Sequence, residues 1–220
     1  NDILLTAATL AFTENGRQEM FAVMMEGHGR DEEYVGEVDL SRTVGWFTSH
    51  YPITLKLPYE SDLGTALKSV KEQLRQPPDD GVSYGLVRYM RPDLLQNNEQ
   101  NPDVLFNYMG QFERSLPASG FFSLARPLQA GFGPHNHPTH PLIIDAYVWQ
   151  EALHVKWTYD PLCIGPESLQ QLANSFITHL KALITHCMTV DSTEYTRSDF
   201  DLVDLDDDQF DRLADILGSL

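Results

Sequence analysis

A chain of 220 residues that is 42% hydrophobic has enough apolar side chains to fill a substantial core. Its formal net charge of -17 disfavours nucleic acid and anionic membrane surfaces as partners, because both require clustered Lys and Arg. No apolar run reaches the roughly 18 residues of a membrane span, and the first residues lack the basic region of a signal peptide. We therefore expect a cytoplasmic protein.

The two cysteines, Cys163 and Cys187, have no metal-ligand spacing between them, so we expect ordinary reduced thiols. The sequence begins without Met, directly before an apolar helical pattern, and we interpret it as cut from something longer.

The first half of the chain predicts helices and strands in mixed order. Residues 2–12 have helical spacing with Asp2 as the cap, and 19–26 is typical of an interior strand followed by two glycines. Residues 51–57 alternate as a strand, whereas 61–78 has a Ser or Asp N-cap, helical periodicity and a Pro-Pro stop. The stretch "GVSYGLVRYM" favours a short helix.

The second half predicts an interior strand at 103–110 and a hairpin formed by 142–150 and 153–159. A long helix starts at Pro166, with one apolar face made of Leu169, Leu172, Phe176, Leu180, Leu183 and Ile184. From Ser198 the chain is strongly acidic and ends in helical spacing, which fits a surface helix or a linker. The pattern as a whole predicts an α/β chain, specifically an α+β sandwich with a mixed sheet.

Glu26 is the first candidate for chemistry because it ends an apolar strand next to Gly27 and Gly29. Buried carboxylates are rare unless they are paired or functional, and glycines allow a ligand or another chain to approach closely. The competing interpretation, favoured by pattern alone, is a structural salt bridge to Arg30 or Arg42. His28 either belongs to a site or hydrogen-bonds a loop.

Other polar residues have weaker signals. His135, His137 and His140 lie in a proline-rich loop whose spacing matches no familiar closed zinc site, so we expect no metal there. Asn107 and Tyr108 are polar positions on an apolar strand and require either buried partners or a ligand. The sequence has no nucleophile elbow, Walker loop or dinucleotide fingerprint, which disfavours triad hydrolases and nucleotide-binding folds.

Five stretches, taken in order, resemble one family. They are "DILLTA" (2–7), "EGHGRD" (26–31), "RTVGWFTSHYP" (42–52), "PPDDGVSYG" (77–85) and "FNYMGQ" (106–111). Together they resemble the epimerization domains of nonribosomal peptide synthetases, which are relatives of the condensation domains. Asp31 stands where the family usually has glutamate, and Ser83 where glycine is more common. The family's H-H-x-x-x-D-G motif is absent from these 220 residues.

The resemblance implies a lobe of the chloramphenicol acetyltransferase type, with the site in a tunnel between two such lobes. The chain would be the C-terminal lobe only: residues 1–15 a helix closing the missing N-terminal lobe, 16–197 the lobe itself and 198–220 an acidic tail. Its partners would be the N-terminal lobe, a peptidyl carrier protein domain and a downstream synthetase subunit. The chain would bind no cofactor by itself, because the substrate is tethered to the carrier's 4'-phosphopantetheine.

By the same resemblance, Glu26 is one of two groups that move a proton at the substrate's α-carbon, and the missing histidine is the other. Asn107 and Tyr108 polarise the thioester carbonyl or orient these groups. Trp46 and Thr48 line the tunnel, and His28 and Arg30 brace the turn that follows Glu26. Two alternatives remain: a peptide-bond-forming condensation domain, and a non-catalytic scaffold that recruits a partner.

Overall fold

The computed structural model describes residues 1–14, 19–30, 38–40, 42–95, 101–111, 138–190, 194–200, 209–210, 212–213 and 216. The chain forms two compact units. The first consists of Asn1–Phe21, Thr54–Pro77 and Gln170–Leu220, and the second of Ala22–Ile53 and Pro78–Leu169.

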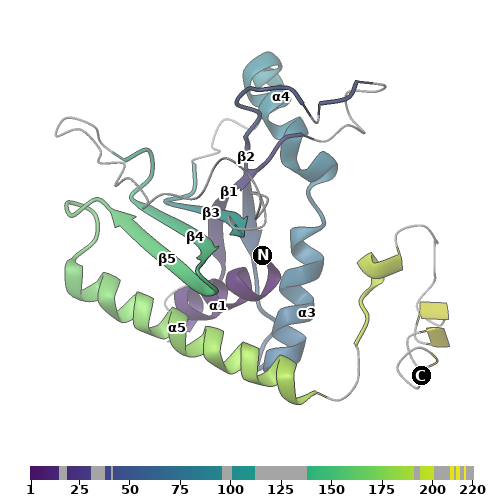
Figure 1. Cartoon of the computed structure of the whole chain (residues 1–220), viewed down its shortest axis with the longest axis vertical. Coiled ribbons are helices and arrows are strands. Elements are labelled where there is room, and N and C mark those ends of the chain that lie inside the picture. The colour runs from purple at the N-terminus through teal and green to yellow at the C-terminus, as the bar shows by residue number, and fades with distance from the viewer. Residues whose placement is uncertain are drawn as a thin grey trace. The chain divides into compact units, whose positions relative to one another are not determined.

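In the described part of the chain, five strands form one mixed sheet in the order β2-β1-β3-β4-β5 (Figure 1). The strands are β1 (Phe21–Gly27), β2 (Ser49–Leu55), β3 (Val104–Gln111), β4 (Leu142–Trp149) and β5 (Ala152–Tyr159). β3 pairs in parallel with both β1 and β4, while β4 and β5 form an antiparallel hairpin. The predicted mixed sheet and hairpin are therefore confirmed, although β2 begins two residues before the predicted strand.

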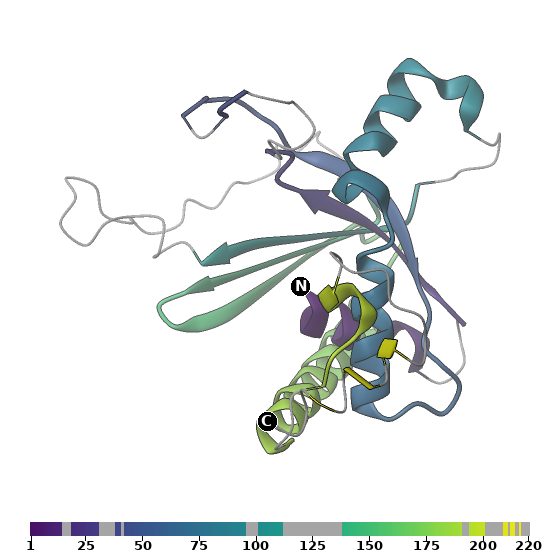
Figure 2. The ribbon, with the colours of Figure 1, turned by 90° about the vertical axis from the view of Figure 1, so that its right-hand side faces the viewer.

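Continuous apolar runs form the middle of this sheet, as expected for strands that are covered on both faces. The runs Val23–Met25, Val104–Phe106 and Leu142–Ile144 are buried throughout. Met24, Leu105 and Ile143 meet in one apolar cluster, which follows from their side-by-side register on the three parallel strands. β3, β4 and β5 lie next to one another in Figure 2.

The second unit also contains α4 (Val82–Met90), the short helix predicted from "GVSYGLVRYM". Single-turn 3-10 helices flank it at η2 (Pro78–Gly81) and η3 (Pro92–Leu94). None of the residues of α4 is buried. α4 is therefore a surface helix of its unit, and its position depends on how its two ends are fixed.

In the first unit, α1 (Asp2–Thr13) packs against α3 (Leu63–Leu74). The side chain of Asp62 caps α3 by accepting the backbone N–H of Thr65 at 2.7 Å, as the sequence predicted for a Ser or Asp. The prediction that Asp2 caps α1 was wrong. Asn1 holds the N-cap position, and Asp2 lies in the first turn, where it forms an ion pair with Arg75 at 3.3 Å.

The long helix α5 (Pro166–Thr189) starts at the predicted proline. Phe176, Leu180 and Leu183 on its apolar face are buried, but Ile184 is 43% exposed, so this face is narrower than predicted. Cys163 and Cys187 are both free and exposed, in agreement with the sequence. None of the helices in the described residues is both long enough and apolar enough to cross a bilayer.

Candidate functional site

Glu26 lies one residue before the end of β1 and directly follows the buried run Val23–Met25. Its side chain is only 18% exposed, because it follows a buried run on an inner strand of the sheet. Its Oε1 lies 3.0 Å from Nε2 of His50, the second residue of the neighbouring strand β2. The carboxylate is thus held in place by an imidazole. Neither Arg30 nor Arg42, the two partners considered from the sequence, forms an ion pair with it among the described residues.

Arg30 instead fixes the loop that follows the strand. Its guanidinium lies 4.3 Å above the ring of Phe47, and its backbone N–H donates to Nδ1 of His28 at 3.0 Å. The guanidinium also donates to three backbone carbonyls, those of Leu40 at 3.0 Å, Thr43 at 2.8 Å and Gly45 at 3.3 Å. Arg30 therefore ties the end of β1 to the segment before β2, and His28 braces the backbone of Arg30.

Gly29 allows this segment to approach the strand end closely. Its φ is +61°, and a Cβ built on it would lie 1.7 Å from the carbonyl oxygen of Phe47. No other residue type fits there, because a side chain would both strain the backbone and collide with a peptide group. The glycine of "EGHGRD" thus brings the loop containing Trp46 and Thr48 next to Glu26's strand.

The register of the sheet places Asn107 beside Glu26. Met25 pairs with Phe106, so the next residues along the two parallel strands, Glu26 and Asn107, lie side by side on one face. Asn107 in turn pairs with Asp145 on β4. Tyr108 follows Asn107 and pairs with Ala146, so alternation directs its side chain to the opposite face of the sheet. Of the two polar residues singled out on this strand, only Asn107 shares the face of Glu26.

Asp145 extends this polar row and was missed in the sequence, where it is an isolated acid inside "LIIDAYVW". It pairs across β4 and β5 with Lys156. Burial raises the pKa of Asp145 above its usual value, and the positive charge of Lys156 only partly offsets this effect. The sequence feature that could have identified Asp145 is an acidic residue at an interior position of an apolar strand.

A cavity of about 440 Å³ lies within the second unit and is lined by part of the same segment. Trp46 and Thr48, which we predicted to line a tunnel, both contribute to it, although the Trp46 side chain remains 87% exposed. Met24 and His50 also line it, so the cavity reaches the partner of Glu26. The remaining lining comes from Gly29 and Phe47, from the start of β2, from α4, and from Asn101 and His140.

The described lining of this cavity contains one arginine and two histidines but no Asp or Glu, even though the chain as a whole is strongly acidic. Arg88 donates to the hydroxyl of Tyr84 at 2.7 Å and to Oδ1 of Asn101 at 2.8 Å, which holds the guanidinium on the wall of the cavity. Such a lining favours ligands that bring hydrogen-bond acceptors.

His140 is the residue in this cavity whose environment sequence reasoning missed. It is 8% exposed, and its Nε2 has no hydrogen-bond partner among the described residues, while Nδ1 lies 3.1 Å from the hydroxyl of Thr139. Burial, and secondarily the nearby His50, lower the pKa of His140, with Asp103 acting in the opposite direction. His135 and His137, the other histidines of the same loop, lie outside the described residues, as does Asp31.

The fold and this site define a lobe built around a mixed sheet with a carboxylate at the end of an inner strand. The condensation domain model matches residues 1–205, and the chain therefore belongs to the condensation domain family. Among the described residues, no group of histidine, cysteine and acidic side chains is arranged to hold a metal ion.

Similar proteins are peptide synthetases of much greater length. The chain is 38% identical over 219 residues to surfactin synthase subunit 1 of Bacillus subtilis. This match covers 98% of the present chain and 6% of that protein. It is 39% identical over 221 residues to chondramide synthase of Chondromyces crocatus, covering 100% of this chain and again 6% of the relative. Gramicidin S synthase 1 of Brevibacillus brevis is 34% identical over 232 residues, with 99% and 21% covered.

Among solved structures, the epimerization domain from the third module of tyrocidine synthetase B is similar, with a TM-score of 0.73 and 34% identity. The match covers 86% of this chain and 42% of that one. The starter condensation domain of rhizomide synthetase has a TM-score of 0.56 at 14% identity, which shows a shared fold alone.

Proposed function

We propose that this chain is the C-terminal lobe of an epimerization domain, and that it takes part in converting an L-aminoacyl or peptidyl thioester on a carrier protein to its D-epimer. The observation that carries the proposal is Glu26, a largely covered carboxylate near the C-terminal end of an inner strand. It is oriented by His50, which lines the cavity. Inverting a stereocentre requires one group to remove the α-proton and another to deliver a proton on the opposite face.

In this mechanism the Glu26 carboxylate takes the α-proton of the thioester, and the electron pair of the broken C–H bond passes to the carbonyl oxygen as an enolate. A histidine of a preceding lobe delivers a proton to the opposite face of the α-carbon, and the enolate electrons return. In the reverse direction the two groups exchange roles. In this proposal Asn107 donates a hydrogen bond to the enolate oxygen, and the register that puts it on the same face as Glu26 supports this role.

The other predicted site residues have separate roles in this proposal. Trp46 and Thr48 line the path of the substrate and its 4'-phosphopantetheine arm, and His28 and Arg30 hold the loop that carries them. Tyr108 lies on the opposite face of β3 and takes no part in this mechanism. The partners are the preceding lobe, the carrier domain and a downstream synthetase subunit.

Similarity supports epimerization over peptide-bond formation. The epimerization domain of tyrocidine synthetase B matches at 34% identity, whereas the starter condensation domain of rhizomide synthetase matches at 14%. Condensation remains the second candidate function, because the family model that matches the chain is the condensation domain.

The test is exchange at the α-carbon in the full-length protein that carries this chain. Its carrier domain is loaded with an α-deuterated L-aminoacyl group, and deuterium loss and D-product are followed in the wild type and in Glu26→Gln. We expect exchange and D-product in the wild type and a loss of roughly 10²-fold or more in the variant. Glu19→Gln, at an exposed glutamate, is the matched control and should retain full activity. A wild-type protein that forms peptide bonds without α-exchange would establish condensation instead.

A further inference from the structure

In the proposed function His50 only orients the Glu26 carboxylate that it contacts. Nε2 of His50 is 3.0 Å from Glu26 Oε1, within hydrogen-bonding distance. The two side chains differ in their access to water: that of Glu26 is 18% exposed and that of His50 48% exposed. His50 also lines the cavity. It therefore joins a covered carboxylate to solvent.

The other cationic side chain near the strand end does not compete for this position. Arg30 is directed to the carbonyls of Leu40, Thr43 and Gly45. An arginine would in any case hold Glu26 charged without exchanging protons, because its guanidinium does not deprotonate in proteins. Histidine can both hydrogen-bond the carboxylate and exchange protons with it, since an imidazole loses and gains a proton near neutral pH.

We infer that His50 is a positioning residue that passes the proton between Glu26 and solvent in each catalytic cycle. The inference rests on the proposed function. After Glu26 has taken the α-proton it is a neutral carboxylic acid, and a neutral His50 with its hydrogen on Nδ1 presents a lone pair at Nε2. The proton crosses from Oε1 to Nε2, which regenerates the carboxylate and forms an imidazolium. The imidazolium then releases its Nδ1 proton to water, and proton exchange with water moves the remaining hydrogen from Nε2 back to Nδ1, which restores the starting tautomer for the next cycle.

This role has a consequence for isotope exchange that a structural role does not have. While the proton remains on Glu26, it can return to the α-carbon from which it came. Fast transfer through His50 replaces it by a solvent proton before that return. Without His50, the epimer whose α-proton is taken by Glu26 should recover its own hydrogen more often, and the opposite epimer should be unaffected.

The experiment uses the full-length protein in D₂O, loaded separately with the L and the D aminoacyl thioester. Deuterium is measured in the recovered starting epimer and in the product, for the wild type and for His50→Gln. We expect turnover to fall on the order of tenfold, and solvent label to be lost from the recovered starting epimer in one direction only. His154→Gln, a matched change at a partly buried histidine of β5, should leave both directions unchanged.

A second variant, His50→Ala, is assayed with and without added imidazole, which enters the open cavity and should restore the label. Equal labelling of wild type and His50→Gln, or an equal loss in both directions, would overturn the role of His50 while leaving epimerization intact. Absence of α-exchange in the wild type would instead refute the proposed function itself.

Discussion

At the scale of single residues, Glu26 depends on two neighbours: His50 of β2, which lies 3.0 Å from its carboxylate, and Gly29, which lets the loop before β2 approach the end of β1. Glu26 could be singled out because it interrupts an apolar strand, and its loop contacts follow from the glycines around it. Its partner could not be found, because His50 is 24 residues away and belongs to a different strand. The sequence instead favoured the arginines nearest along the chain.

His140 leads to a prediction about stability and pH. Burial lowers its pKa, so the folded protein prefers the neutral imidazole, whereas the unfolded chain titrates near its ordinary pKa of about 6.5. Below about pH 6.5 the unfolded chain binds the proton more readily than the folded protein does. The free energy of unfolding therefore decreases as the pH falls from 6.5 toward the lowered pKa. Above pH 6.5 both states are neutral and no difference remains.

We therefore expect His140→Gln to flatten the dependence of the unfolding free energy on pH below about 6.5. Urea unfolding at several pH values measures the slope, and the wild type should lose stability toward acid more steeply than the variant. Parallel curves for wild type and His140→Gln would mean that His140 does not titrate differently on folding.

At the scale of elements, agreement between sequence and structure is closest where the signal is local. Asp62 as a cap, Pro166 as a helix start and the β4-β5 hairpin each follow from a few neighbouring residues. Strand order does not. β1 and β3 are neighbours although they are far apart in the chain, and nothing in either segment specifies the register that sets Glu26 beside Asn107.

The two glycines of "PPDDGVSYG" should respond oppositely to the same substitution. Gly81 caps α4 with a φ of +81°, and an added Cβ would lie 2.0 Å from the Tyr51 ring, so Gly81→Ala should cost roughly 2 kcal/mol or more. Gly85 lies inside α4 with open space around it, so Gly85→Ala should stabilise by roughly 0.5–1 kcal/mol.

Chemical denaturation of the two variants measures both effects, and the matched substitution makes each the control of the other. Pairing Gly81→Ala with Tyr51→Ala should recover part of the loss by removing the collision, while leaving the backbone strain. Destabilisation of both glycine variants by the same amount would contradict the contact between Gly81 and Tyr51 as the cause.

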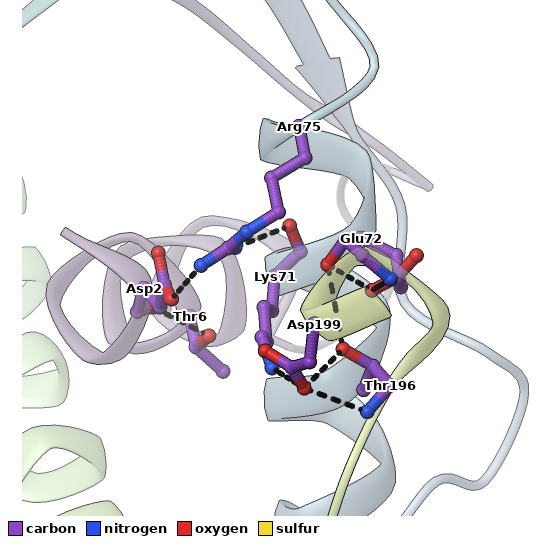
Figure 3. A network of polar contacts seen from close by, with 8 residues as sticks. Asp2, Thr6, Lys71, Glu72, Arg75, Thr196 and Asp199 are labelled. Atoms are coloured by element: carbon purple, nitrogen blue, oxygen red, sulfur yellow. Dashed lines mark hydrogen bonds and ion pairs between the residues drawn. The ribbon is translucent and has the colours of Figure 1, made fainter. Parts of the chain in front are cut away.

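At the scale of the whole molecule, the order of the five motifs supports the family more firmly than any single site. The mixed sheet predicted from strand and helix patterns is present, and the family model extends over most of the chain. For the acidic end from Ser198, the composition and helical spacing predicted only a surface helix or a linker. Composition does not reveal that Ser198 and Asp199, the first residues of that end, form polar contacts with α3. Figure 3 shows Asp199 next to Lys71 of α3.

These contacts attach residues 194–200, which include η5 (Arg197–Phe200), to one side of α3 within the first unit. Asp199 forms an ion pair with Lys71 and accepts the backbone N–H of Thr196 at 2.8 Å. Glu72 accepts the hydroxyl of Ser198 at 2.6 Å. Burial acts to raise the pKa of both carboxyls, but these hydrogen bonds and Lys71 outweigh it and hold each pKa below its usual value.

Acid should therefore release this segment from α3. Because both pKa values are lowered on docking, the stabilisation is complete above the ordinary carboxyl pKa of about 4 and is lost as the pH falls through the lowered values. Asp199→Asn removes the charge and should weaken docking at neutral pH by on the order of 1 kcal/mol, because a charge-assisted hydrogen bond is replaced by a neutral one. The amide ¹H shifts of Thr196 and Ser198 report the change, since both N–H groups donate to these carboxylates.

The matched control is Asp93→Asn, whose carboxylate forms an exposed pair with Arg91 in the second unit and should leave the two amide shifts unchanged. Raised salt should weaken the Lys71 contact much less than an exposed pair, because the Lys71 side chain is only 17% exposed. Amide shifts of Thr196 and Ser198 that stay constant down to pH 3 would show that the carboxylates of Asp199 and Glu72 do not hold the segment on α3.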